Sequence, residues 1–124
     1  MLKAKQPLTQ SFRNAARGLY HATGERSFFI QLCMGIVALA LAFVLSLSLI
    51  ERIIIMLLVA LVLALEAFNT AIEILLDHVT PEQHNSVARI KDVMAAGVFI
   101  ISLCALIIGI LIFADALMLS LRYA

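Results

Sequence analysis

Four polar side chains interrupt a long apolar segment in the middle of the sequence, and their types and spacing could support catalysis. They are Glu66, Asn69, Glu73 and Asp77, at offsets of 0, 3, 7 and 11 residues. This spacing puts all four on one face of an α-helix. Placing a carboxylate inside a membrane costs about 2.5 kcal/mol or more, so such residues usually mark chemistry or transport. The polar stripe therefore predicts a functional site.

The composition predicts an all-α membrane protein with a single domain of 124 residues. Hydrophobic residues make up 64% of the chain, whereas soluble domains have about half. Three segments are long enough to cross a bilayer, for which roughly 20 residues suffice: residues 27–50, 53–76 and 93–114. The pattern of apolar and polar residues in 9–22 predicts a short amphipathic helix that lies in the headgroup layer. A tight turn is expected at Leu49–Arg52.

The distribution of basic residues predicts the orientation in the membrane. Basic residues precede the first span and lie between the second and third spans: Lys3, Lys5, Arg13, Arg17, Arg26, Arg89 and Lys91. By the positive-inside rule, the N-terminus is cytoplasmic and the C-terminus lies outside. No signal peptide is expected, because a long polar segment precedes the first apolar run. The net charge of +1 gives no indication of nucleic-acid binding.

The depth of each polar residue suggests a reaction. A rise of about 1.5 Å per residue from Ile53 puts Glu66 roughly 20 Å into the membrane, with Glu73 about 10 Å further, near the cytoplasmic boundary. Carboxylates and an ammonium are expected at the same cytoplasmic rim: Glu25, Glu73, Asp77, Lys91 and Asp92. Such groups can hold a magnesium-bound nucleotide. The recessed Glu66 is placed to act as a base on a lipid hydroxyl, so the pattern suggests a lipid kinase.

The same residues carry a family resemblance. The run Glu66-Ala67-Phe68-Asn69-Thr70-Ala71-Ile72-Glu73, followed by Asp77, Glu82, His84, Lys91 and Asp92, strongly resembles the bacterial integral-membrane diacylglycerol kinase family. The family pattern is E-x-x-N-[ST]-A-I-E-x-x-x-D, then E-x-H in a short loop, then K-D before small residues. The resemblance covers nearly the whole chain. The family also includes undecaprenol kinases, so the choice of lipid stays open.

The resemblance implies a function and a role for each residue. It implies an ATP- and Mg²⁺-dependent kinase of the bacterial inner or plasma membrane, acting on diacylglycerol, with homotrimeric subunits that share active sites. Glu66 resembles the general base, with Asn69 and Asp77 organising the site, and Glu25 and Glu73 resemble the Mg²⁺ ligands. The expected ATP contacts are Glu82, Gln83, His84, Lys91 and Asp92. Gln31 departs from the pattern, because some members carry an acidic residue there.

Other interpretations of these residues remain open. Glu66 and Glu73 could be structural acids that hydrogen-bond between helices, or a proton relay in a small oligomeric transporter. Lys91 and Asp92 could simply pair at the start of a helix, and His84 could be a loop residue without function. A transporter predicts ion flux without ATP, but gives no reason for the Lys91–Asp92 pair.

Overall fold

The structure, a computed structural model, consists of four helices and describes residues 7–45, 47–80 and 84–122. Their bounds are Leu8–Ala22 (α1), Arg26–Val44 (α2), Leu49–Val79 (α3) and Asn85–Arg122 (α4). The last three are long and apolar enough to cross a membrane, which confirms the predicted all-helical class with three candidate spans. A helix is also found near residues 9–22, and its position in the headgroup layer stays a prediction.

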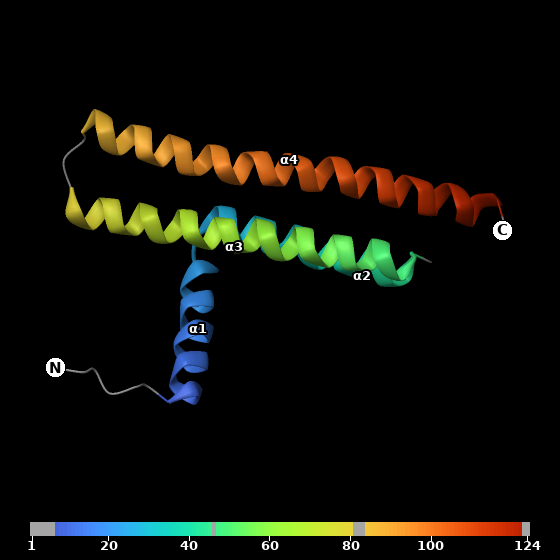
Figure 1. The fold of residues 1–124 in the computed structure, drawn as a ribbon, viewed down its shortest axis with the longest axis horizontal. Coiled ribbons are helices and arrows are strands. Elements are labelled where there is room, and N and C mark those ends of the chain that lie inside the picture. The colour runs from blue at the N-terminus through green and yellow to red at the C-terminus, as the bar shows by residue number, and fades with distance from the viewer. Residues whose placement is uncertain (1–6, 46, 81–83, 123–124) are drawn as a thin grey trace.

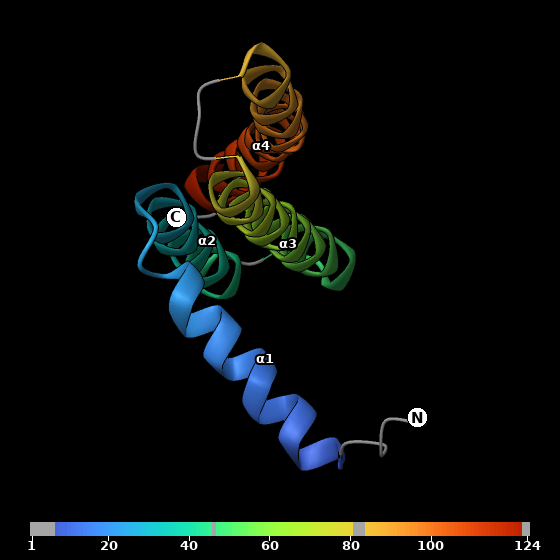
Figure 2. The same ribbon diagram turned by 90° about the vertical axis from the view of Figure 1, so that its left-hand side faces the viewer.

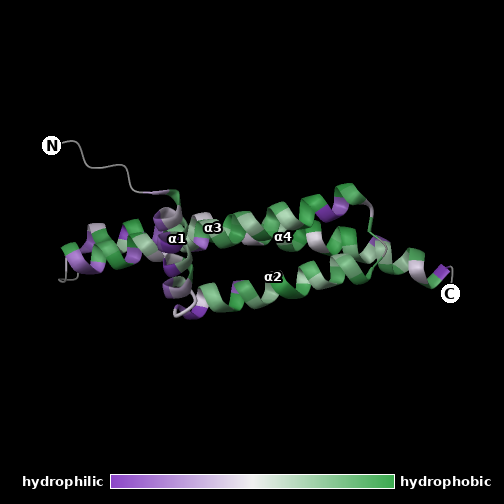
Figure 3. Ribbon diagram, turned by 90° about the horizontal axis from the view of Figure 1, so that it is seen from below, coloured by the Kyte–Doolittle hydropathy of each residue, from purple (hydrophilic) through white to green (hydrophobic). Residues whose placement is uncertain are grey.

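The three long helices run along a common direction, and α1 stands across them (Figure 1). Helix α3 is the central element, because it packs against both α2 and α4, as the end-on view also shows (Figure 2). Apolar residues cover most of α2, α3 and α4, while hydrophilic residues gather on α1 and on the ends of α3 and α4 beyond it (Figure 3). The polar residues of interest are thus concentrated toward one end of the bundle.

The turn between α2 and α3 lies earlier than the sequence predicted, and the placement at Leu49–Arg52 was wrong. Those residues form the first turn of α3, which Ser48 caps. The Ser48 hydroxyl accepts a hydrogen bond from the Glu51 N–H, and the Glu51 carboxylate accepts one from the Ser48 N–H at 2.7 Å. This reciprocal pair is a capping box, which satisfies two backbone donors that a helix start would otherwise leave free.

Close packing of α2 on α3 depends on a glycine. Gly35 is buried on α2, and a Cβ added there would lie 2.8 Å from Cγ1 of Val59 on α3. Small residues at such a contact let two helix backbones approach closely within a membrane. Further along the contact between α2 and α3, a buried core is formed by Ala42, Leu47 and Ile55. These contacts fix the register of α2 on α3, and hence which α2 side chains meet the polar stripe.

Candidate functional site

Glu66 is the most deeply buried charged residue of the stripe, with only 2% of its surface exposed. Both of its carboxylate oxygens accept hydrogen bonds from α2. The Ser27 hydroxyl donates to one oxygen, and the Gln31 amide donates to the other at 3.2 Å. Because Ser27 and Gln31 are one helical turn apart, they reach the same carboxylate from one face of α2. A buried carboxylate is costly unless it is hydrogen-bonded, and these two donors meet that need.

Sequence reasoning did not identify Ser27 and Gln31 as partners of Glu66. Gln31 drew notice only as a departure from the family pattern. Ser27 and Gln31 are four residues apart at the start of an uncharged span, and this spacing indicates a shared polar face on α2. Helical periodicity shows which face of α3 carries the acids, but it does not show which residues of another helix meet that face.

A second group of charges lies further along α3, where it meets α4. The Lys91 ammonium donates a hydrogen bond to Asp77 Oδ1 at 2.5 Å and lies 4.0 Å from Glu73 Oε1. Lys91 precedes the apolar segment of α4. There the hydrogen bond from Lys91 to Asp77 raises the pKa of Lys91, because a nearby carboxylate favours the charged ammonium. Lys91 therefore places a positive charge beside Asp77 and Glu73 at neutral pH.

A cavity of about 170 Å³ lies beside these charges, between α3 and α4. Its polar lining comes from Asn69 and Glu73 on α3 and from Lys91 and Asp92 on α4. The structure thus brings together four of the residues that the sequence singled out. Carboxylate oxygens are ligands that Mg²⁺ prefers, and one or two of them suffice when phosphate oxygens and waters complete the shell. The lining therefore fits a magnesium-bound phosphate group.

The remaining predicted site residues do not line this cavity or lie outside the described part of the chain. Glu25 immediately precedes α2, and because Ser27 touches Glu66, the start of α2 lies level with Glu66. Glu73 is two turns, or about 10 Å, further along α3. His84 lies within 3.2 Å of the Ser86 hydroxyl. Glu82 and Gln83 lie outside the described residues.

Glu66 is set apart along α3 from the group formed by Glu73, Asp77 and Lys91. Among residues 7–45, 47–80 and 84–122, no three His, Cys, Asp or Glu side chains lie close enough together to hold a metal ion. Glu66 meets α2, whereas Glu73 and Asp77 meet Lys91 of α4. One face of α3 therefore presents a buried carboxylate first and a charged cavity about two turns later.

Comparison with known proteins identifies the family of the chain. The prokaryotic diacylglycerol kinase family matches residues 13–113, most of the chain. The protein belongs to this family. The chain is 37% identical to an undecaprenol kinase of Bacillus subtilis over 109 residues, which is 87% of this chain and 89% of the relative. It is 36% identical to a diacylglycerol kinase of Haemophilus influenzae over 104 residues, which is 83% of this chain and 86% of the relative.

Membership in the prokaryotic diacylglycerol kinase family makes the protein a lipid kinase with a nucleotide phosphoryl donor. It confirms the resemblance seen in the sequence and favours a kinase over an ion transporter. The three apolar helices agree with a membrane protein that acts on a lipid. The two relatives differ in the lipid for which they are named, and the identity of this chain to the two differs by one percentage point.

Proposed function

We propose that the protein transfers the γ-phosphoryl group of ATP to the hydroxyl of diacylglycerol at the cytoplasmic face of a bacterial inner membrane. The observation that carries this proposal is the buried Glu66 carboxylate, hydrogen-bonded by Ser27 and Gln31, below a cavity lined by Glu73 and Lys91. A buried carboxylate beside lipid and a charged cavity about two turns away match the two substrates of a lipid kinase. Undecaprenol is the alternative substrate, and the similarity to the Bacillus enzyme favours testing it equally.

In this proposal Glu66 is the general base. Each carboxylate oxygen has a second lone pair besides the one used by Ser27 or Gln31, so Glu66 can accept the proton of the lipid hydroxyl. The hydroxyl oxygen then forms a bond to the γ-phosphorus as the bond to the β,γ-bridging oxygen breaks, which releases ADP. Asn69 and Asp77 organise the site, Asp77 by holding Lys91 in place.

The charged cavity is the proposed site for the phosphates of ATP. Lys91 neutralises phosphate charge as the phosphoryl group moves. Glu73 and Glu25 are the proposed Mg²⁺ ligands, and a bound Mg²⁺ would stabilise the negative charge on the transferring group. Asp92, His84, Glu82 and Gln83 are the further proposed ATP contacts.

Two features of the proposal concern the assembly and its orientation. We expect a homotrimer with active sites shared between neighbouring copies, as the family resemblance implies. The N-terminus is expected in the cytoplasm and the C-terminus outside, by the positive-inside rule. Residues from another copy could then complete the shell around Glu73.

The proposal is tested by substituting Glu66→Gln in the purified protein and following transfer of labelled phosphate from ATP. We expect the rate to fall by roughly 10²- to 10⁴-fold, the usual contribution of a general base, while circular dichroism shows an unchanged helical fold. Glu51→Gln is the matched control, because it changes another acid of α3 at the opposite end, where glutamine can also complete a capping box. Retained turnover in Glu66→Gln would rule out its role as base.

The substrate is tested with the wild-type protein offered diacylglycerol and undecaprenol side by side. Preferred phosphorylation of diacylglycerol supports the proposal as stated. Preferred phosphorylation of undecaprenol would replace the substrate while keeping the mechanism. Phosphorylation of neither lipid would contradict the proposed function.

A further inference from the structure

An arginine at the end of the bundle where α3 begins, far from the charged cavity, lacks an anionic partner in the described residues. Arg52 is half-buried near the start of α3, and its Nε atom is buried with no hydrogen-bond partner among residues 7–45, 47–80 and 84–122. Its guanidinium lies over the ring of Phe43 on α2, 5.7 Å from the ring centroid. A guanidinium carries a full charge and five donors, for which the face of a ring offers only a weak cation–π contact.

The acidic residue next to Arg52 in the sequence does not supply this anion. Consecutive residues of a helix do not face each other, and the Glu51 carboxylate accepts a hydrogen bond from the Ser48 N–H at 2.7 Å as part of the capping box. In the part of the chain that the structure describes, the ion pairs belong to Lys91, near the opposite end of α3. Within these residues of one copy, no acid pairs with Arg52.

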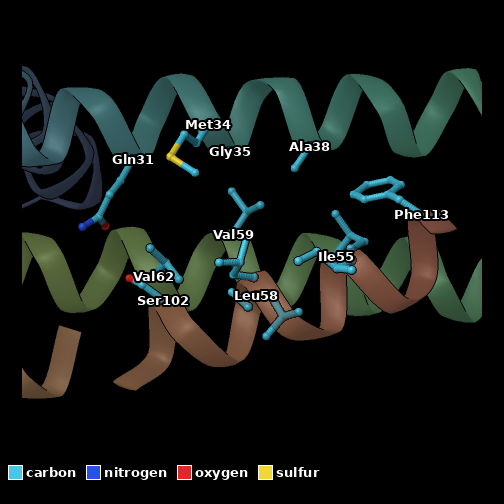
Figure 4. A pocket seen from close by; sticks show the side chains of 14 residues that line it. Gln31, Met34, Gly35, Ala38, Ile55, Leu58, Val59, Val62, Ser102 and Phe113 are labelled. Atoms are coloured by element: carbon cyan, nitrogen blue, oxygen red, sulfur yellow. The ribbon is translucent and has the colours of Figure 1, made fainter. Parts of the chain in front are cut away.

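Helices α3 and α4 keep a constant register along their contact. Near one end, Asp77 of α3 pairs with Lys91 of α4. At a distance of 22 residues on each helix, from position 77 to 55 and from 91 to 113, Ile55 and Phe113 belong to the same apolar group (Figure 4). Because the two helices are antiparallel, a residue closer to the start of α3 lies opposite a residue closer to the end of α4.

This register places an acid of α4 at nearly the level of Arg52. Arg52 precedes Ile55 by three residues. Asp115 follows Phe113 by two, so the two charges differ in level by about one residue, or about 1.5 Å. Ala116 packs against the buried core, whereas the preceding Asp115 points about 100° away from it and is exposed. The two opposite charges thus share a level, but Asp115 faces away from the core of its own copy.

We propose that Arg52 of one copy forms an ion pair with Asp115 of a neighbouring copy, at the end of the bundle where α3 begins. The inference rests on the homotrimer of the proposed function. In a closed ring, each copy offers Arg52 to one neighbour and Asp115 to the other, which is a head-to-tail interface. Because the two charges lie at one level, these ion pairs fix the height of each copy relative to the next.

A second copy of the chain fits Arg52 better than a lipid phosphate does. Charged residues on membrane helices usually pair with one another or with backbone groups. A phosphate would satisfy Arg52 but leave Asp115 without a cation. A neighbouring copy satisfies both charges at once, and it needs no component besides the chain itself.

The test reverses each charge alone and then both together. Wild-type protein, Arg52→Glu, Asp115→Arg and the double variant are purified in dodecyl maltoside, whose micelles contain no phosphate. Light scattering on dilution gives the protein concentration at which half of the oligomer dissociates. We expect each single reversal to raise that concentration at least about tenfold, because like charges then meet across the interface. The double variant should return to near the wild-type concentration, since opposite charges meet again.

Arg122→Glu is the matched control, because it reverses an exposed arginine at the same end, two turns beyond Asp115 on α4. It should leave dissociation unchanged. Oligomers whose stability is the same in both single reversals as in wild type would overturn the ion pair. So would an effect of Arg52→Glu that appears only when phosphatidylglycerol is added, since that result would assign the arginine to a lipid phosphate.

Cross-linking keeps the inference testable if the reversed variants do not fold. One chain carries Arg52→Cys and a second chain carries Asp115→Cys, both with Cys33→Ser and Cys104→Ser, so that each chain has one cysteine. The two are reconstituted together and treated with a short bismaleimide, and linked peptides are identified by mass spectrometry. We expect links between positions 52 and 115, and few when Arg122→Cys replaces Asp115→Cys. Absence of the 52–115 link, or links between two copies of position 52 alone, would overturn the proposal.

These outcomes are distinct from those of the kinase proposal. A wild-type protein that is monomeric overturns the ion pair and the expected homotrimer, while transfer of labelled phosphate from ATP in the same sample decides the kinase activity. An oligomer that shows the 52–115 link but transfers no phosphate to either lipid overturns the kinase proposal and leaves the ion pair.

Discussion

Replacing Gly35 by alanine should loosen the contact between α2 and α3. The new Cβ would lie 2.8 Å from Val59 Cγ1, where ordinary contacts are 3.4–4 Å. The valine side chain cannot easily turn away, because a β-branched residue in a helix has one strongly preferred rotamer. The two helices must therefore separate by several tenths of an ångström. Overpacking of this kind typically costs about 1–3 kcal/mol.

A matched control isolates that cost from the effect of alanine on the helix itself. Alanine favours a helix over glycine by about 0.5–1 kcal/mol, and this gain applies to any glycine in a helix. At Gly109, also on a membrane helix, an added Cβ meets no described atom within 4 Å. The difference in unfolding free energy between Gly35→Ala and Gly109→Ala should therefore equal the free-energy cost of the overlap alone, about 1–3 kcal/mol.

The assay is unfolding of the purified protein in mixed micelles by increasing sodium dodecyl sulfate, followed by circular dichroism. In a Val59→Ala background, Gly35→Ala should lose its penalty, because the atom that it overlaps is gone. A double-mutant cycle then gives a coupling free energy between positions 35 and 59 of about the same 1–3 kcal/mol. Equal stability of the Gly35 and Gly109 variants, or a coupling near zero, would refute the close approach of the two helices.

Two further predictions concern the site. Lys91→Gln removes the positive charge beside Asp77 and Glu73. The KM for ATP should then rise roughly tenfold or more, as for loss of a hydrogen bond to a charged group. An equal rise in the KM for the lipid would contradict a role of Lys91 at the phosphates. Ser27→Ala leaves one oxygen of the buried Glu66 without its donor, which should lower stability by about 1–3 kcal/mol and reduce kcat. Ser27→Thr keeps the hydroxyl and should restore both, and its failure to do so would argue against the hydrogen bond.

The helices and the polar face of α3 could be predicted because each depends on local patterns. Long apolar segments must form helices in lipid, since every backbone group needs an internal partner. The offsets of Glu66, Glu73 and Asp77 put them on one side of any helix that contains them. The turn was misplaced because apolarity continues through Leu49 and Ile50, whereas the start of α3 is determined by the capping box of Ser48 and Glu51.

The partners of those acids could not be predicted, because they depend on how the helices are offset along one another. Equal depth for the cytoplasmic ends of all three spans is what places Glu25 at the same rim as Glu73, and that placement stays a prediction. In the structure, contacts such as Gly35 on Val59 set the offset of the helices, and α2 begins level with Glu66. The same offset brings Ser27 and Gln31 to Glu66, a pairing that no single-helix pattern contains.

The two hydrogen bonds on Glu66 have a consequence for the course of turnover. Both carboxylate oxygens are already oriented by α2 in the isolated chain, so no rotation of this side chain has to accompany arrival of a ligand. In the proposed mechanism the base is therefore aligned when the protein folds, and solvent reorganisation around it would add little to the barrier. The slowest events are then expected in the exchange of lipids between bilayer and protein, where membrane fluidity would govern the overall speed.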